Sequence, residues 1–224
     1  DLEKLAKVGR KTDVVYLSNP HLPFGGFYSP EELDAFIKKA SPATVIIDEC
    51  YIQYLGKDFE KQSCARLVEK HSNLIVVRTF SKIYGLAAMR IGYHVIPEAL
   101  WVKSGAMEKI TGIRGRNDRD VSLSAAASAI GALDDLSHMQ KTRAHTENIK
   151  STLHQTAGEL GIHSIENPIG GFFTFIYKNA DPKLIKHLND NDILARRIYG
   201  TKDYYQYITT ARNSDIQAYI KQLR

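Results

Sequence analysis

The residues best suited to covalent chemistry lie in one segment, residues 78–93, which reads RTFSKIYGLAAMRIGY. Lys82 follows a short apolar run and two hydroxyl residues, Thr79 and Ser81, and Arg90 comes eight residues later. A lysine that is partly desolvated or near other cations becomes a nucleophile toward a carbonyl group. Hydroxyl groups and a guanidinium together make a good cradle for a phosphate. The segment therefore predicts an imine-forming amine beside a phosphate site, and the alternative is a lysine on a surface loop.

A second candidate is the carboxylate of Asp48, which ends the apolar run TVIID at residues 44–48. Ligands of α/β folds bind at the carboxyl ends of strands, where a carboxylate is costly unless it meets a positive partner. Tyr51 follows three residues later, and an acid beside a phenol suits a protonated heterocycle that carries a phenolate oxygen. Taken alone, Asp48 is read more simply as a strand-end residue that caps the next loop.

The elements that must position these residues alternate between strand and helix patterns, which is typical of an α/β fold. The predicted strands lie at residues 14–18, 44–48, 74–77 and 91–96, and the predicted helices at 30–40, 63–70, 97–109 and 121–158. The first helix is predicted from the sequence Ser-Pro-Glu-Glu at 29–32, in which Ser29 would be the N-cap and Glu32 its partner in a capping box. The runs at 44–48 and 74–77 are continuously apolar. They therefore predict strands buried on both faces, as in a parallel sheet under helices.

The pattern changes after Gly161, where short strands and two helices predict a small α+β unit. Its strands are expected in HSIE, GGFFTFIYK and YQYITTA, and its helices at residues 182–190 and 213–223. We place a domain boundary near residue 140, which gives a larger domain at 1–140 and a smaller one at 141–224.

Composition excludes several other classes of protein. A net charge of +5 permits attraction to anions, but the charges are dispersed and no nucleic-acid-binding motif occurs, so neither nucleic acid nor membrane is an expected partner. No run of about 18 apolar residues is present, and the first residues lack a signal-peptide core, so a cytoplasmic location is expected. Two widely spaced cysteines, Cys50 and Cys64, do not make a metal site.

Three motifs follow the order and spacing seen in fold-type I aminotransferases. They are SNPxxPxG at residues 18–25, DExY at 48–51 and TxSKxxGLxxxRxGY at 79–93. The chain most resembles the branch that contains histidinol-phosphate aminotransferases and threonine-phosphate decarboxylases. The resemblance implies the C-terminal part of the large domain, a mostly parallel sheet with flanking helices, followed by a small α+β domain.

The resemblance also implies pyridoxal 5'-phosphate as cofactor and a role for each matching residue. Lys82 would form the internal aldimine and shuttle a proton, Asp48 would pair with the protonated pyridine nitrogen, and Tyr51 would bond the ring's 3'-oxygen. The cofactor phosphate would be bound by Thr79, Ser81 and Arg90. The implied partners are a small-molecule amino donor, an oxo-acid acceptor and a second copy of the chain in a homodimer. The implied role is in amino-acid metabolism.

The loop at residues 18–25 departs from the family pattern. The asparagine that normally touches the cofactor is replaced by Leu22, which cannot donate a hydrogen bond. Asn19 remains a cofactor-binding candidate, although its place at a strand end also suits a turn cap. His21 is a weaker substitute, and a turn residue is the simpler interpretation of it.

Two further departures concern the substrate and the start of the chain. Tyr207 stands where the family has an arginine that grips the substrate, so Arg196, Arg197, Arg212 and the basic loop 114–119 are alternative candidates. The glycine-and-serine phosphate loop expected ahead of the first strand is absent. We therefore expect a fragment, a cleaved product, one piece of a split protein or a degenerate relative, which by itself would hold the cofactor poorly.

The leading hypothesis is transamination of an amino acid or amino-alcohol phosphate. Decarboxylation of a phosphorylated amino acid would use every residue named so far and is the first alternative. A non-catalytic binding or scaffold protein is the second. Leu22, Tyr207 and the missing N-terminal part favour it, and it is opposed by the joint presence of Lys82, Asp48, Tyr51 and Arg90.

Overall fold

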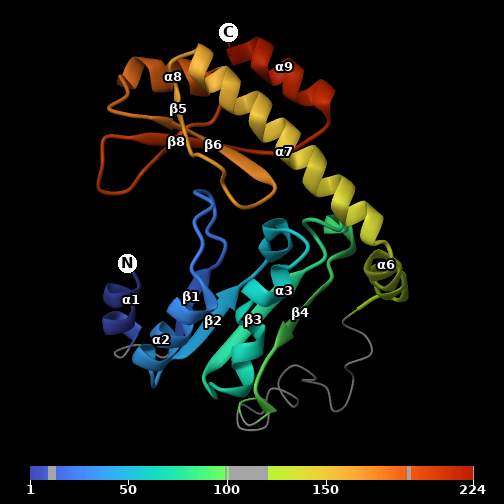
Figure 1. Cartoon of the computed structure of the whole chain (residues 1–224). Coiled ribbons are helices and arrows are strands. Elements are labelled where there is room, and N and C mark those ends of the chain that lie inside the picture. The colour runs from blue at the N-terminus through green and yellow to red at the C-terminus, as the bar shows by residue number, and fades with distance from the viewer. Residues whose placement is uncertain (10–13, 99, 101–120, 191–192, 224) are drawn as a thin grey trace. The chain divides into compact units, whose positions relative to one another are not determined.

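The computed structural model describes residues 1–9, 14–98, 100, 121–190 and 193–223, which form two compact units (Figure 1). The first unit comprises residues 1–21 and 26–140, and the second comprises residues 22–25 together with the chain from 141 onward. The basic loop at 114–119 and nearly all of the helix predicted at 97–109 lie outside the described residues.

A four-stranded sheet in the order β1-β2-β3-β4 organises the first unit. Its strands are β1 (Val14–Ser18), β2 (Thr44–Asp48), β3 (Leu74–Thr79) and β4 (Gly92–Val95). The first three run parallel and β4 pairs antiparallel with β3, so the predicted mostly parallel α/β sheet is confirmed. The register pairs Ser18 with Asp48 and Asp48 with Val77, so the carboxyl ends of the parallel strands lie at one edge.

Helices on one face of this sheet form the core of the unit. They are α1 (Leu2–Gly9), α2 (Pro30–Ala40) and the 3₁₀ helix η2 (Cys64–Glu69). α2 begins where the sequence Ser-Pro-Glu-Glu predicts, because the Ser29 hydroxyl accepts from the Glu32 N–H and the Glu32 carboxylate accepts from the Ser29 N–H. Along the chain, η1 (Ile52–Leu55) and α3 (Phe59–Gln62) come between β2 and β3, and η3 (Ala87–Met89) comes between β3 and β4.

Only alternate side chains of β2 and β3 are fully buried. Val45 and Ile47 are fully buried on β2, as are Leu74 and Val76 on β3, whereas the side chains between them are partly exposed. The prediction that both faces are buried is therefore wrong for the described residues, because a continuous apolar run does not reveal which face is covered. Asp48 belongs to the partly exposed face, which is where the candidate site lies.

The second unit is an antiparallel sheet covered by helices. The strands, in the order β5-β6-β8-β7, are β5 (His163–Ser164), β6 (Phe172–Tyr177), β8 (Tyr204–Thr209) and β7 (Arg196–Arg197). The helices α7 (Leu136–Glu159), α8 (Pro182–Asp190) and α9 (Asn213–Leu223) supply most of the core that packs on β6. α7 is separated from α6 (Leu123–Asp134) by Asp135 and begins within the first unit.

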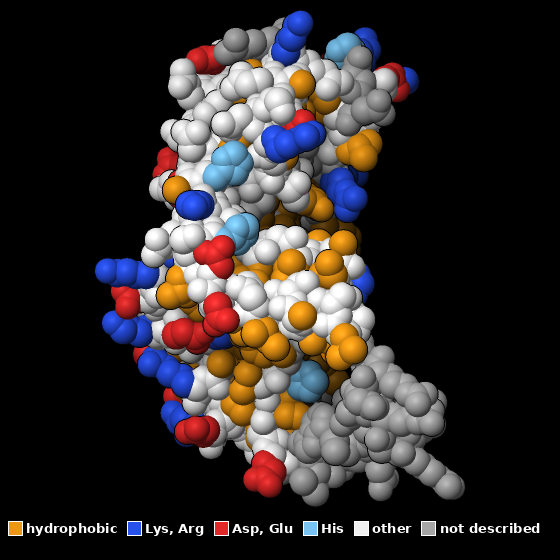
Figure 2. All heavy atoms as spheres, turned by 90° about the vertical axis from the view of Figure 1, so that its right-hand side faces the viewer, with side chains coloured by type: hydrophobic (Ala, Val, Ile, Leu, Met, Phe, Trp, Pro, Cys, Tyr) orange, Lys and Arg blue, Asp and Glu red, His pale blue; other side chains and the backbone are white. Residues whose placement is uncertain are grey.

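The surface agrees with the dispersed charge of the sequence. On the face shown in Figure 2, acidic and basic side chains lie beside one another. Among the described residues, no helix is both long and apolar enough to cross a membrane. No group of three or more His, Cys, Asp or Glu side chains in the described part of the chain could hold a metal ion.

Candidate functional site

Asp48 lies at the carboxyl end of β2 and accepts hydrogen bonds from two neutral donors. Its Oδ1 accepts from the backbone N–H of Cys50 at 2.8 Å, and its Oδ2 accepts from the hydroxyl of Tyr16. Neither donor carries a charge, and an ionised carboxylate offers about four acceptor positions. The carboxylate can therefore accept a further, positively charged donor such as a protonated ring nitrogen.

Lys82 and Tyr51 lie together at the ends of the neighbouring strands. The Lys82 Nζ is 5.3 Å from the centre of the Tyr51 ring, a distance typical of a cation–π contact. Tyr51 is only 6% exposed, whereas Lys82 is exposed. Because Lys82 is exposed, the described residues do not desolvate its amine. The partial desolvation predicted from the sequence is therefore not found among them.

Cys50 connects the two sides of the site. Its backbone N–H donates to Asp48, and its thiol interacts electrostatically with both Asp48 and Lys82. Burial, with a hydrogen bond to Asp48, raises the pKa of the Cys50 thiol to about 12 despite the opposing effect of Lys82. The thiol therefore stays protonated near neutral pH and does not compete with Lys82 as the nucleophile. Asp48, Tyr51 and Lys82 are thus brought to one place.

The three residues predicted to bind phosphate line one pocket of about 330 Å³. The Thr79 hydroxyl accepts from the Ser81 N–H at 3.0 Å, which fixes the turn that leads to Lys82. Arg90 is exposed and gives one hydrogen bond, at 2.8 Å, to the backbone oxygen of Ala87. A guanidinium has five N–H donors, so Arg90 retains donors for an anion. The site thus supplies an amine, an acceptor for a ring nitrogen and phosphate donors, which together fit the cofactor implied by the sequence.

Arg90 adopts a left-handed backbone conformation with φ of 52°. Such a conformation disfavours residues other than glycine by roughly 1–2 kcal/mol, and it persists where the surrounding structure imposes it. It ends η3 and turns the chain back into β4. The arginine is therefore retained at a position whose backbone favours glycine, which is consistent with a role for its side chain.

Replacing Arg90 by glycine is expected to separate binding from stability. The Arg90→Gly variant should keep its stability or gain up to about 1 kcal/mol. Glycine relieves the strained backbone, and the greater freedom of the unfolded chain offsets part of that gain. Its affinity for pyridoxal 5'-phosphate should fall by about tenfold or more with the loss of a charged phosphate donor. Urea unfolding and cofactor titration measure the two effects, and a variant that loses stability but retains affinity would contradict the assignment.

Asn19 is placed differently from a typical ligand-binding side chain. It is 1% exposed, and its amide binds the backbone of Tyr28 twice, donating to the carbonyl oxygen at 3.0 Å and accepting from the N–H at 2.8 Å. These bonds hold the loop between β1 and α2, which favours the turn-capping interpretation. The His21 N–H likewise closes a turn on the Gly26 oxygen at 2.7 Å. A cofactor contact by Asn19 stays a prediction.

Leu22 belongs to a short segment that packs within the second unit. Gly25 has a φ of +69°, and a Cβ there would lie 2.4 Å from the Pro168 Cα, so this close approach requires glycine. The Thr174 hydroxyl donates to the Pro23 oxygen, and the Ile169 N–H donates to the Gly25 oxygen. Leu22, which replaces the asparagine of the family, therefore lies in a loop that is fixed by contacts with residues 168–174.

The alternative substrate-binding residues of the second unit lie on its surface. Tyr207 is 39% exposed on β8, and Arg196 and Arg197 are exposed on β7. Arg212 forms a two-point ion pair with Asp215, at 3.0 and 3.2 Å, which engages one edge of its guanidinium. Which of these residues meets a substrate stays a prediction.

Sequence reasoning missed a buried ion pair beneath the site. Glu49 is fully buried next to Asp48, and its Oε2 accepts from the Arg78 Nε at 3.0 Å and from the Ser63 hydroxyl at 2.7 Å. Arg78 also binds Glu60 through two hydrogen bonds. Since Arg78 precedes Thr79, the pair ties the end of β2 to the end of β3. The available signal for this pair was that Glu49 and Arg78 each stand directly beside a predicted strand.

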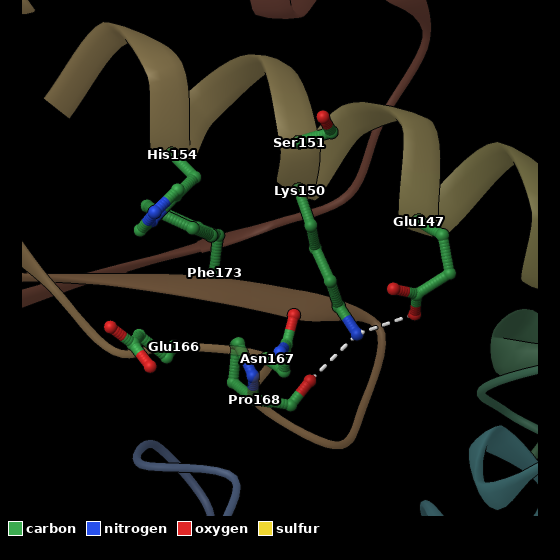
Figure 3. A pocket seen from close by; sticks show the side chains of 8 residues that line it. All are labelled: Glu147, Lys150, Ser151, His154, Glu166, Asn167, Pro168 and Phe173. Carbon is green, nitrogen blue, oxygen red and sulfur yellow. Dashed lines mark hydrogen bonds and ion pairs between the residues drawn. The ribbon is translucent and has the colours of Figure 1, made fainter. Parts of the chain in front are cut away.

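A separate pocket of about 380 Å³ lies within the second unit, between α7 and the loop after β5 (Figure 3). Its lining residues are Glu147, Lys150, Ser151, His154, Glu166, Asn167, Pro168 and Phe173. The buried Lys150 Nζ donates to Glu147 at 2.8 Å and to the Pro168 oxygen at 2.6 Å, so its charge ties the loop to the helix. None of the residues predicted to act on the cofactor lines this pocket.

Comparison with known proteins places the chain among enzymes of one family. A model of "aminotransferase class I and II" matches residues 1–205. The histidinol-phosphate aminotransferase of Hyphomonas neptunium is 32% identical over 200 residues, which cover 88% of this chain and 52% of that protein. Histidinol-phosphate aminotransferase 2 of Hydrogenovibrio crunogenus is 36% identical, over 93% of this chain and 54% of that protein.

Solved structures agree with the sequence matches. The histidinol-phosphate aminotransferase of Sinorhizobium meliloti, solved in complex with pyridoxal-5'-phosphate, superposes with a TM-score of 0.76 at 26% identity. The match covers all of this chain and 62% of that one. The chain thus spans about half to three-fifths of the length of the relatives it matches.

Proposed function

Because the chain belongs to the family of class I and II aminotransferases, we propose that the protein transfers amino groups with pyridoxal 5'-phosphate as its cofactor. The observation that carries the proposal is the grouping of Lys82 and Tyr51 with Asp48 at the ends of two adjacent parallel strands. An amine, a phenol and a carboxylate free of cationic protein partners among the described residues are the groups such a cofactor requires.

Each side chain has a defined part in this proposal. The cofactor supplies an aldehyde and a ring that accepts electrons. Lys82 holds that aldehyde through its amine and later moves a proton at the substrate carbon. Asp48 accepts from the protonated ring nitrogen and keeps it charged, while the Tyr51 hydroxyl bonds the oxygen on the ring.

The phosphate end is assigned to the pocket next to this group. Ser81 and Arg90 donate to the phosphate, and Thr79 holds the turn that presents both Ser81 and Lys82.

In this proposal, residues 1–140 are part of the large cofactor-binding domain and residues 141–224 are the small domain. A homodimer is proposed from the family, and light scattering of the full-length protein tests it.

The proposed substrate is a phosphorylated amino alcohol, with an oxo acid as the acceptor. This step rests on the relatives, which are histidinol-phosphate aminotransferases that match most of the chain. Transamination is preferred to decarboxylation for the same reason.

The test is an assay of the protein at the full length that its gene encodes, with histidinol phosphate and a 2-oxo acid. We expect an amino acid to form from the oxo acid in proportion to the donor consumed. Release of carbon dioxide from a phosphorylated amino acid would favour a decarboxylase. Cofactor binding without either reaction would favour a binding protein.

A further inference from the structure

Tyr16 contacts the candidate site although no motif of the sequence includes it. It lies on β1, where it pairs with Ile46, two residues before Asp48 on β2. Residues two positions apart on a strand share a face, so Tyr16 and Asp48 are diagonal neighbours on the partly exposed face. The Tyr16 hydroxyl spans this diagonal and donates to Asp48 Oδ2.

The carboxylate of Asp48 is thereby held from two sides. The Cys50 N–H fixes Oδ1 from the chain that follows β2, and Tyr16 fixes Oδ2 from the neighbouring strand. Partial desolvation of the hydroxyl and its bond to Asp48 raise the pKa of the Tyr16 phenol, so the hydroxyl keeps its proton and remains a donor at physiological pH. Two fixed donors leave the carboxylate little freedom to rotate.

Tyr16 contributes little to the core. It is 59% exposed and is not part of the buried cluster on the opposite face of the sheet. Removal of its hydroxyl therefore leaves the packing of the unit intact, and the effect of that hydroxyl on Asp48 can be measured separately.

We propose that Tyr16 is a positioning residue, whose hydroxyl holds the Asp48 carboxylate in the orientation that accepts the protonated ring nitrogen of the cofactor. The inference rests on the proposed use of pyridoxal 5'-phosphate and adds a residue from β1 to its site. Tyr16 acts through Asp48 and does not itself need to touch the cofactor.

The experiment compares the full-length wild type with Tyr16→Phe, which removes only the hydroxyl. Affinity for pyridoxal 5'-phosphate, measured by fluorescence titration, should weaken by about three- to thirtyfold, the range expected for one hydrogen bond to a partly exposed charge. The absorption spectrum of the bound cofactor should also change its pH dependence, because that spectrum reports protonation of the imine, and the pKa of the imine depends on the charge of the ring nitrogen. Tyr199→Phe is the matched control, since Tyr199 is fully exposed, and it should behave as wild type.

A double-mutant cycle separates positioning from general stability. In an Asp48→Ala background, Tyr16→Phe should change cofactor affinity by less than about twofold, since the group it positions is gone. Equal effects in both backgrounds, or tighter binding by Tyr16→Phe alone, would overturn the proposal. An unaltered Tyr16→Phe beside a cofactor-binding wild type would also overturn it, yet leave the proposed function standing. A wild type that binds no cofactor would remove both.

Discussion

The Lys82→Ala variant is expected to lose covalent attachment of pyridoxal 5'-phosphate altogether. The wild type at full length should develop an absorbance band near the visible edge, and borohydride should abolish the band and fix the cofactor to the peptide that contains Lys82. Alanine has no amine to condense with the aldehyde. Turnover should fall by at least about 10²–10⁴-fold, the range attributed to a single positioned proton-transfer group.

Two variants test whether the amine or merely its charge matters. Lys82→Arg keeps a positive charge beside Tyr51 but cannot form the same bond, so it should also lack the band. Lys57→Ala removes an exposed lysine from the same unit and should keep it. A cofactor label that maps to another lysine, or a normal band in Lys82→Ala, would refute the assignment.

The features that sequence could predict were local. Ser29 and Glu32 mark the start of α2 because a capping box involves residues only three positions apart. Short apolar runs at residues 44–48 and 74–77 predict β2 and most of β3, and three motifs with fixed spacing predict the family. Each of these signals is complete within one short segment.

The features that sequence could not predict depend on which strands are neighbours. The Tyr16–Asp48 bond needs the register of β1 on β2, and the Glu49–Arg78 pair needs that of β2 on β3. Burial on one face was missed for the same reason, since an apolar run does not reveal its cover. Asn19 illustrates a related limit, because a motif residue that binds backbone looks the same in sequence as one that binds a ligand.

The Glu49→Ala variant is expected to lose about 3–5 kcal/mol of stability, the typical effect of removing one partner from a buried ion pair. Glu49 is fully buried, and the Arg78 side chain is only 6% exposed. Without Glu49, the guanidinium keeps Glu60, but the Cys64 N–H and the Ser63 hydroxyl lose their buried acceptor. Urea unfolding of the full-length protein measures the loss.

Glu60→Ala provides the matched control, because Glu60 binds the same guanidinium but its side chain is 62% exposed. Its removal should lower stability by about 1 kcal/mol or less, as for other exposed ion pairs. If the two variants were equally stable, the buried pair would not be what ties the two strands together. If only Glu49→Ala is unstable, the pair supports both Asp48 and Thr79, since each adjoins one of its members. The catalytic geometry at the strand ends would then depend on charges that never meet the cofactor.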